Sequence, residues 1–387
     1  MSPTKHSNLG ASSAHRWLAC PGSVAAIDAL PIGNTSSPFA IEGTAAHELS
    51  EICLMSGEDA EAWIGKPLVE MPDWVVDEEM VEYVQVYLDY CRAIAKGADE
   101  VFIEQTVSYE DWVPQGFGTN DFGALLIKDK RIKIADLKYG KGVQVDAENN
   151  PQAMLYALGT YAEYGWVSEF DYIDIAIVQP RLYHISEWSI SVKDLLKWAE
   201  WVSQRAEIAL SKDAERVPGE KQCRFCEAKP TCKALMKYTE DIIMADFDDL
   251  DEMASPDTLT DVQLRKVLET KSLIEGWLSS VETVVRERLE GGEPFDGFKL
   301  VEGRSLRKWG NETAAAEALT EVLGTDVAFK STLISPAQAE KALKKDQRSM
   351  LDDLVIKPAG KPTLVPEDDK RRAINLTEGD FEDVSDG

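Results

Sequence analysis

The sequence predicts an α/β fold in which a mixed β-sheet is flanked by helices. Three stretches of strand-like length, 101–109, 118–127 and 131–139, alternate between apolar and polar residues or are largely apolar. A helical stretch at 151–164 follows, and another apolar stretch of strand-like length comes at 170–181. Three consecutive strands, a crossover helix and a further strand give a sheet with both antiparallel and parallel neighbours.

Three helices are expected before the sheet. The first spans 11–20 and ends at Pro21 and Gly22, which interrupt a helix. The second spans 43–55, and the third spans 72–97, where apolar residues recur at helical spacing.

Within and after the predicted sheet, the connections are short. Residues 128–130 form a polar turn, so the strands on either side of it are expected to pair as a hairpin. A further strand is expected at 184–190, and a helix at 192–211 follows it.

The last third of the chain has a different pattern. A long helix is predicted at 261–292, where two glycines end it, and a small β-hairpin is predicted at 298–309. Short helical patterns continue to about residue 345. We therefore divide the chain into three parts: a domain at 1–240, a mainly helical accessory domain at 241–375 and an acidic disordered tail at 376–387.

Composition limits the classes of function. The 387 residues carry a formal net charge of -28, which argues against binding nucleic acid through the overall field. A local basic cleft remains compatible with this charge, because the Debye length in the cell is only about 8 Å. No apolar run is long enough for a transmembrane helix, and the first residues lack the apolar stretch of a secretory signal, so a cytoplasmic location is expected.

The residues that point most directly to chemistry are Asp121, Asp136 and Lys138. Asp136 and Lys138 are two residues apart, so on a strand they lie on the same face, and the predicted hairpin brings Asp121 alongside. Carboxylates are the ligands that Mg²⁺ or Mn²⁺ prefers, and a lysine beside them can orient a water molecule. Taken alone, however, an Asp-x-Lys pair is far more often a solvated surface pair at the end of a strand.

Four motifs occur in the order found in the RecB-like branch of the PD-(D/E)XK nuclease superfamily, which this chain resembles. Gly43-Thr44-Ala45-Ala46-His47 resembles the family's G-T-x-x-H helix, and Gly118-Thr119-Asn120-Asp121 resembles its G-x-x-D strand. The segment 136–140 resembles the D-x-K-T-G motif, with Tyr139 in place of Thr. Gln152 and Tyr156 match the family's Q-x-x-x-Y helix.

This resemblance implies a restriction-endonuclease-like core and assigns roles to residues. Asp121, Asp136, Lys138, Gln152 and Tyr156 are the expected catalytic residues. The expected metal ligands are His47, Asp121, Asp136 and Glu104. Without the resemblance, His47 would be interpreted as an ordinary helix histidine. Glu104, in the preceding strand, either completes the site or faces solvent.

The cysteines suggest a second metal site. Cys223, Cys226 and Cys232 have the spacing of metal ligands, and Cys20, followed by proline, is the natural fourth ligand. Iron–sulfur members of the RecB-like branch carry one cysteine before the nuclease motifs and three after, so the resemblance implies a [4Fe–4S] cluster. A structural Zn²⁺ ion is the alternative, and reduced cysteines without metal are a third interpretation. Cys53 and Cys91 lie on apolar helix faces and are expected in the core.

The predicted function is a metal-dependent DNA nuclease, specifically an exonuclease in phage recombination or replication. The expected partners are DNA and a single-strand-binding or recombination protein, with no membrane. The alternative is a non-catalytic DNA-binding or scaffold module that retains the fold. In the last third, Arg304, Lys308 and Trp309 form a small basic and aromatic patch, interpreted as a single-strand contact or as a solvated hairpin face.

Overall fold

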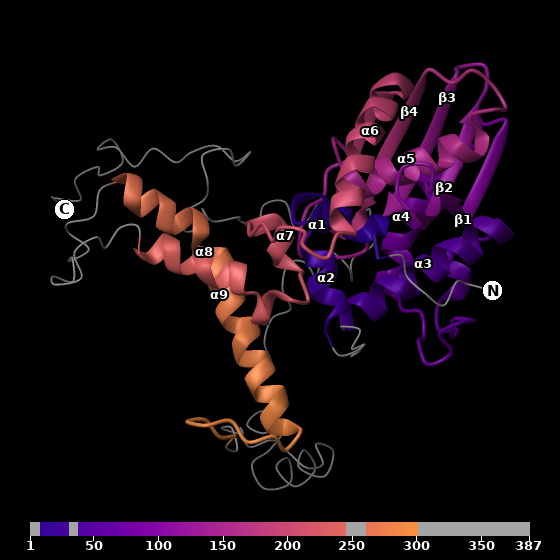
Figure 1. Ribbon diagram of the computed structural model, residues 1–387. Helices are drawn as coiled ribbons and strands as arrows, with labels where there is room; N and C mark the ends of the chain where they lie inside the picture. The colour runs from indigo at the N-terminus through magenta and orange to yellow at the C-terminus, as the bar shows by residue number, and fades with distance from the viewer. Residues whose placement is uncertain (1–7, 31–37, 245–260, 301–387) are drawn as a thin grey trace, which may run out of the picture. The chain divides into compact units, whose positions relative to one another are not determined.

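The computed structural model describes residues 8–30, 38–244 and 261–300 (Figure 1). Contacts along the chain group Met1–Glu293 into one compact unit and Pro294–Gly387 into a second. The elements that carry the candidate site all belong to the first unit. Among the described helices, none is both long and apolar enough to cross a membrane.

The first unit contains a five-stranded mixed sheet. Its strands are β1 (Glu100–Ser108), β2 (Phe117–Leu126), β3 (Arg131–Leu137), β4 (Tyr172–Gln179) and β5 (His184–Ser191), and they lie side by side in this order. The pair β3–β4 is parallel and the other pairs are antiparallel. The predicted mixed sheet flanked by helices, including the hairpin of β2 and β3, is therefore confirmed.

One face of the sheet is covered by α5 (Pro151–Tyr164) and α6 (Val192–Ala209), joined by α1 (Ala14–Ala19) (Figure 1). Helix α5 begins where the sequence predicts, because the side chain of Asn150 accepts a hydrogen bond from the Ala153 amide at 3.2 Å. Apolar side chains of these helices and of the strands make one buried cluster, with Trp17 at its centre fully buried. This layer fixes the α5 side of the candidate site.

The other face is covered by α3 (Pro38–Ser56) and α4 (Glu78–Ala95), which form a second buried cluster with the sheet. The prediction that the latter helix starts near residue 72 is wrong. The carboxylate of Asp77 caps the helix by accepting from the Met80 amide at 2.8 Å. Before this cap the chain makes a turn at 72–73, where the Trp74 amide donates to the Met71 carbonyl at 2.8 Å, and Val75 then pairs with Pro67 in an isolated bridge.

Several short elements and the long helix α9 complete the described part of the chain. They are η1 (Ala11–Ser13), α2 (Ser23–Asp28), η2 (Ala60–Trp63), η3 (Pro180–Leu182), α7 (Glu220–Arg224), η4 (Lys229–Thr231), α8 (Lys233–Met244) and α9 (Asp261–Glu290). Helix α9 contacts α7 and η4, where Leu273 packs with Cys223 and Leu235. The domain boundary predicted at residue 240 therefore lies inside the first compact unit.

The predicted hairpin at 298–309 is described only at its start. Phe298, Lys299 and Leu300 form no strand, and the remainder lies outside the described residues. The same holds for Arg304, Lys308 and Trp309, for the short helical patterns up to 345 and for the acidic tail at 376–387.

Candidate metal centre

The centre of the site is an interruption in the pairing of β1 with β2. The ladder stops at Ile103↔Phe122 and resumes at Gln105↔Asn120, so Glu104 and Asp121 are opposite each other but outside it. Glu104 has a φ of 45°, a left-handed conformation that is uncommon for a residue other than glycine. Residues held in such conformations cluster at functional sites.

Strand β2 changes face across this interruption. Gly123 lies under the ring of Phe102, which stacks on Tyr164 of α5 with ring centroids 4.8 Å apart. Asn120, three residues earlier, also reaches α5, where its amide donates to Thr160 Oγ1 at 3.5 Å. Residues three apart on a regular strand point to opposite faces, so the strand turns over between them. Asp121 lies at this turnover.

Three potential metal ligands converge there. The ligand atoms of His47, Glu104 and Asp121 all lie within 4.8 Å of one another. His47 Nδ1 is 3.5 Å from Asp121 Oδ2 and 3.9 Å from Glu104 Oε1. One nitrogen and two carboxylates form a donor set that suits Mg²⁺ or Mn²⁺. The structure thus brings together three of the four residues predicted as metal ligands, from α3, β1 and β2.

The charged side chains in this group shift one another's pKa values. Burial alone would lower the pKa of His47, but the carboxylates of Asp121 and Glu104 outweigh it and raise that pKa to about 9. Burial is the main cause that raises the pKa of Asp121 to about 7; the charges of Asp136 and Glu104 add to the rise, and those of His47 and Lys138 oppose it. Asp121 Oδ2 also accepts a hydrogen bond from the Leu137 amide at 2.8 Å. A cation bound here would relieve the crowding of acidic groups.

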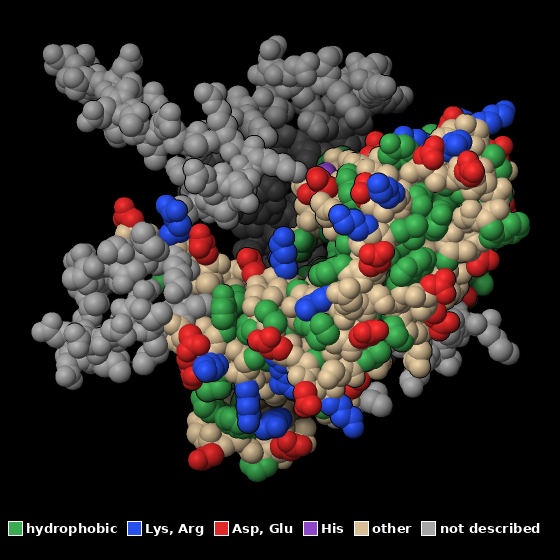
Figure 2. All heavy atoms as spheres, turned by 45° about the horizontal axis from the view of Figure 1, so that its top comes forward, with side chains coloured by type: hydrophobic (Ala, Val, Ile, Leu, Met, Phe, Trp, Pro, Cys, Tyr) green, Lys and Arg blue, Asp and Glu red, His purple; other side chains and the backbone are tan. Residues whose placement is uncertain are grey.

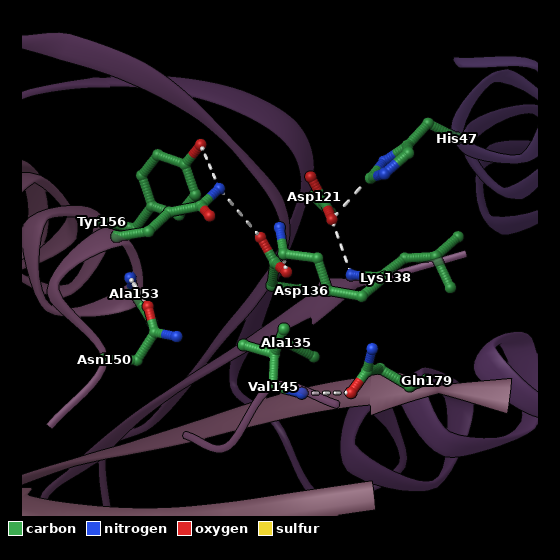
Figure 3. Close-up of polar contacts among 12 residues, drawn as sticks. His47, Asp121, Ala135, Asp136, Lys138, Val145, Asn150, Ala153, Tyr156 and Gln179 are labelled. Atoms are coloured by element: carbon green, nitrogen blue, oxygen red, sulfur yellow. Dashed lines mark hydrogen bonds and ion pairs between the residues drawn. The ribbon is translucent and has the colours of Figure 1, made fainter. Parts of the chain in front are cut away.

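Asp136 and Lys138 lie on the neighbouring strand and form an ion pair. Lys138 Nζ is 2.6 Å from Asp136 Oδ2, and Gln152 Nε2 donates to Asp136 Oδ1 at 3.5 Å. Gln152 also donates to the hydroxyl of Tyr156 at 3.2 Å. Figure 3 shows His47, Asp121, Asp136 and Lys138 converging, with Tyr156 on the α5 side. Asp136, predicted as the fourth ligand, is held beside the three-residue group rather than within it.

Glycine at position 118 is required by the α5 side of the site. A Cβ atom there would lie 2.6 Å from Cε1 of the Tyr156 ring. The first residue of the Gly118–Asp121 motif therefore gives Tyr156 the room to reach Gln152. Asn120 of the same motif is fully buried and bonded to Thr160, a role that the sequence analysis missed. The polar Asn120 directly before Asp121 was the sequence signal for this role.

Arg181, in η3, was also missed by the sequence analysis. Its side chain is 5% exposed and pairs with Glu42 of α3 at 2.8 Å and with Glu79 of α4 at 3.0 Å. Its guanidinium lies over the ring of Tyr139, 4.8 Å from the centroid. Arg181 thus links Tyr139, the residue after Lys138, to the two helices that cover this face of the sheet. Tyr139 stands where the resemblance expects threonine, and Arg181 is its packing partner.

A second buried polar residue fixes the chain that follows the motif. Gln179, at the end of β4, accepts from the Val145 amide at 2.6 Å and donates to the Val143 carbonyl at 2.9 Å (Figure 3). It is 1% exposed. A glutamine that ends an apolar strand was a signal for such a role.

The four cysteines predicted as ligands meet although they are far apart in the sequence. Cys20, Cys223, Cys226 and Cys232 line one small cavity. The Val217 amide donates to Cys20 Sγ at 3.2 Å, and the Gly219 amide donates to Cys223 Sγ at 3.5 Å. Burial, together with the charges of the three other thiols, raises the pKa of Cys223 to about 11, while the hydrogen bond from the Gly219 amide opposes the rise. As predicted, Cys53 and Cys91 are fully buried in the core beneath α3 and α4.

Fold and site together define an α/β protein with a carboxylate–histidine group that can hold a metal ion and a separate cluster of four cysteines. The profile of one protein family matches residues 6–372, which include both groups. The chain belongs to this family, described as a protein of unknown function (DUF2800).

Proposed function

We propose that this protein is a metal-dependent DNA nuclease with a restriction-endonuclease-like core. The observation that carries the proposal is the group His47, Glu104 and Asp121, whose ligand atoms lie within 4.8 Å of one another. It lies beside an Asp136–Lys138 ion pair of 2.6 Å. A divalent ion can activate water for the hydrolysis of a phosphodiester, and an ammonium group beside it can stabilise the charge that develops on the phosphate. The order of the four motifs, which resembles that of RecB-like nucleases, supports the same proposal.

Each residue has a chemical task in this proposal. His47, Glu104 and Asp121 would hold Mg²⁺ or Mn²⁺, which supplies Lewis-acid activation of a water molecule and neutralises phosphate charge. Lys138 would donate to a phosphate oxygen or orient the attacking water. Asp136 holds the Lys138 ammonium, and Gln152 in turn orients Asp136 through its second oxygen. Tyr156 fixes the amide of Gln152 by accepting its other hydrogen bond.

The four cysteines line one small cavity and fit a metal group. We propose a [4Fe–4S] cluster there, because the resemblance implies it, with a structural Zn²⁺ ion as the alternative. Amide donors to Cys20 and Cys223 are of the kind that stabilise coordinated thiolates.

The biological setting that we propose follows from the resemblance: an exonuclease acting on DNA in phage recombination or replication, in the cytoplasm, with a single-strand-binding or recombination protein as partner. The face shown in Figure 2 has basic and acidic side chains interspersed over its described residues. With a net charge of -28, contact with DNA has to be local rather than through the whole surface.

The test is a nuclease assay on end-labelled linear DNA and on circular DNA with Mn²⁺, Mg²⁺ or EDTA. We expect degradation of linear DNA that requires the ion, and a loss of at least about a hundredfold in Asp121→Asn and Lys138→Met, the scale seen when a group that stabilises the transition state is removed. Asp129→Asn and Lys128→Met change the same residue types in the exposed turn before β3 and should keep full activity.

Two outcomes would contradict the proposal. Full nuclease activity in both Asp121→Asn and Lys138→Met would contradict the assignment of these residues to the active site. DNA binding by the native protein without cleavage under any divalent ion would favour the alternative, a non-catalytic DNA-binding or scaffold module. Cleavage of the circular substrate would identify an endonuclease rather than an exonuclease.

A further inference from the structure

A cleft of about 790 Å³ opens beside the candidate metal centre. It is lined by His47 and Asp121 of that centre, by Arg16 of α1 and by Glu227, which follows Cys226. The cleft therefore extends from the candidate metal centre to the cysteine segment. Its volume is within the range of about 300–1,000 Å³ that is usual for ligand sites.

Arg16 is the one lysine or arginine among the described residues that line this cleft. Its side chain is half-buried, and its Nη1 donates to Ser23 Oγ at 3.0 Å. Within the described part of the chain, no carboxylate forms an ion pair with it, although a guanidinium has five N–H donors. Arg16 thus lines the cleft with N–H donors that no carboxylate of the described residues pairs with.

The surroundings of Arg16 leave its charge only partly offset. Burial lowers the pKa of Arg16 even though four neighbours, Cys226, Glu227, Cys20 and Asp28, act to raise it. The desolvation of this guanidinium thus outweighs the stabilisation of its charge by the acidic neighbours. An anion that enters the cleft would complete its contacts, and a phosphate matches the planar fork of an arginine with two parallel hydrogen bonds.

We propose that Arg16 binds a backbone phosphate of the DNA strand in this cleft, at a subsite between the candidate metal centre and the cysteine segment. This inference rests on the proposed nuclease function. It accounts for how a chain with a charge of -28 holds an anionic polymer, through a guanidinium in a cleft rather than through the overall field. The competing role for Arg16 is to offset the charge of the nearby thiolates of Cys20 and Cys226.

The experiment measures binding separately from cutting. The full chain is titrated into a fluorescein-labelled single-stranded oligonucleotide with Ca²⁺ in place of Mn²⁺, between 50 and 200 mM KCl. Arg16→Gln should weaken binding by about tenfold at 100 mM KCl and reduce the slope of log K against log salt by about 0.7, the value for one phosphate of a single strand. Arg16→Lys should keep the slope, because the charge remains, with only part of the affinity lost.

Arg286→Gln is the matched control, because Arg286 is an exposed arginine of α9 that does not line the cleft. It should bind as the native protein does. If the slope of log K against log salt were unchanged in Arg16→Gln, the phosphate subsite would be wrong. If Arg16→Gln also lost the cysteine-bound metal, Arg16 would instead offset the charge of the thiolates.

Cleavage with Mn²⁺ is recorded for the same proteins. Native protein that cuts DNA while Arg16→Gln keeps its slope contradicts the subsite alone. Native protein that binds in an Arg16-dependent manner without cutting contradicts the nuclease alone. Native protein that neither binds nor cuts contradicts both.

Discussion

At the residue scale, His47 shows how neighbours decide the chemistry of a side chain. A helix histidine exposed to water has a pKa of about 6.5 and is mostly neutral at physiological pH. Beside Asp121 and Glu104 the pKa of His47 rises to about 9, so the imidazole is protonated at neutral pH while no cation is bound. A metal ligand has to be the neutral imidazole, so a proton must leave when the ion binds.

The raised pKa of His47 predicts that metal binding strengthens as the pH rises. Below pH 9 the ion competes with the proton on His47, and below pH 7 it also competes with a proton on Asp121. Between pH 6.5 and 8.5 the affinity for Mn²⁺ should therefore rise by up to about tenfold per pH unit. Calorimetry in buffers of different ionisation enthalpy should show release of about one proton per ion.

His47→Gln should bind Mn²⁺ more weakly and with less pH dependence. His184→Gln alters a histidine paired with Asp146 outside the metal-binding group and should behave as the native protein does. Equal Mn²⁺ affinity of the native protein at pH 6.5 and 8.5 would contradict the assignment of His47 as a ligand.

At the element scale, the site depends on how closely α5 lies against β1 and β2. Gly159 of α5 faces Val107 of β1, where a Cβ atom would lie 2.7 Å from Cγ2. Gly118 of β2 leaves the corresponding room for Tyr156. Two glycines, one on each element, thus permit an approach that brings Gln152 within reach of Asp136.

Gly118→Ala tests this approach. The added Cβ would overlap the Tyr156 ring, so either the ring or the helix must move. We expect a loss of about 1–3 kcal/mol in the free energy of unfolding, the usual cost of overpacking, measured by urea denaturation. The proposed nuclease activity should fall as well, because Tyr156 holds Gln152.

The control for this substitution is Gly97→Ala. Gly97 is exposed, and a Cβ atom there would have no neighbour within 4 Å. Its effect should stay within about 0.5 kcal/mol. If Gly118→Ala were as stable as Gly97→Ala, the close packing of α5 on β2 would not require glycine at position 118.

At the scale of the whole molecule, the cysteine cluster joins the start of the described chain to the segment that follows α6. Cys20 ends α1, and Arg205 of α6 reinforces the same junction by donating to the Leu18 carbonyl from Nε at 2.9 Å. A bound metal group would stabilise only the folded chain, and it would close a loop of about 200 residues.

Cys20→Ser is therefore expected to lose the cysteine-bound metal and to lower the melting temperature. Metal analysis of anaerobically purified protein should give iron and sulfide in the native chain and a strong reduction in the variant. Cys91→Ala removes a thiol from the core beneath α4 and should keep its metal content. Colourless native protein with stoichiometric zinc would contradict the iron–sulfur assignment, and full metal content in Cys20→Ser would contradict the role of Cys20.

The local pattern of apolar and polar residues was sufficient to predict much of the fold. The period of apolar residues predicts the strands and α5, and the spacing of two residues places Asp136 and Lys138 on one face, where they form their ion pair. The start of α4 was placed too early, because the apolar residues of 72–77 continue the helical pattern while the Asp77 cap determines where the helix begins. The packing of α9 on the cysteine segment, across the predicted boundary at residue 240, is a contact between distant residues that local pattern does not report.

What the sequence determined by itself is the set of elements and the residues with reactive side chains: His47, Asp121, Asp136, Lys138 and the cysteines. Only the tertiary structure decided how these meet. The left-handed backbone at Glu104, the turnover of β2 at Asp121 and the place of Arg16 in the cleft all arise from packing between segments distant in sequence. Periodicity reports the neighbours of a residue along one element, whereas a metal centre is made by side chains from several elements.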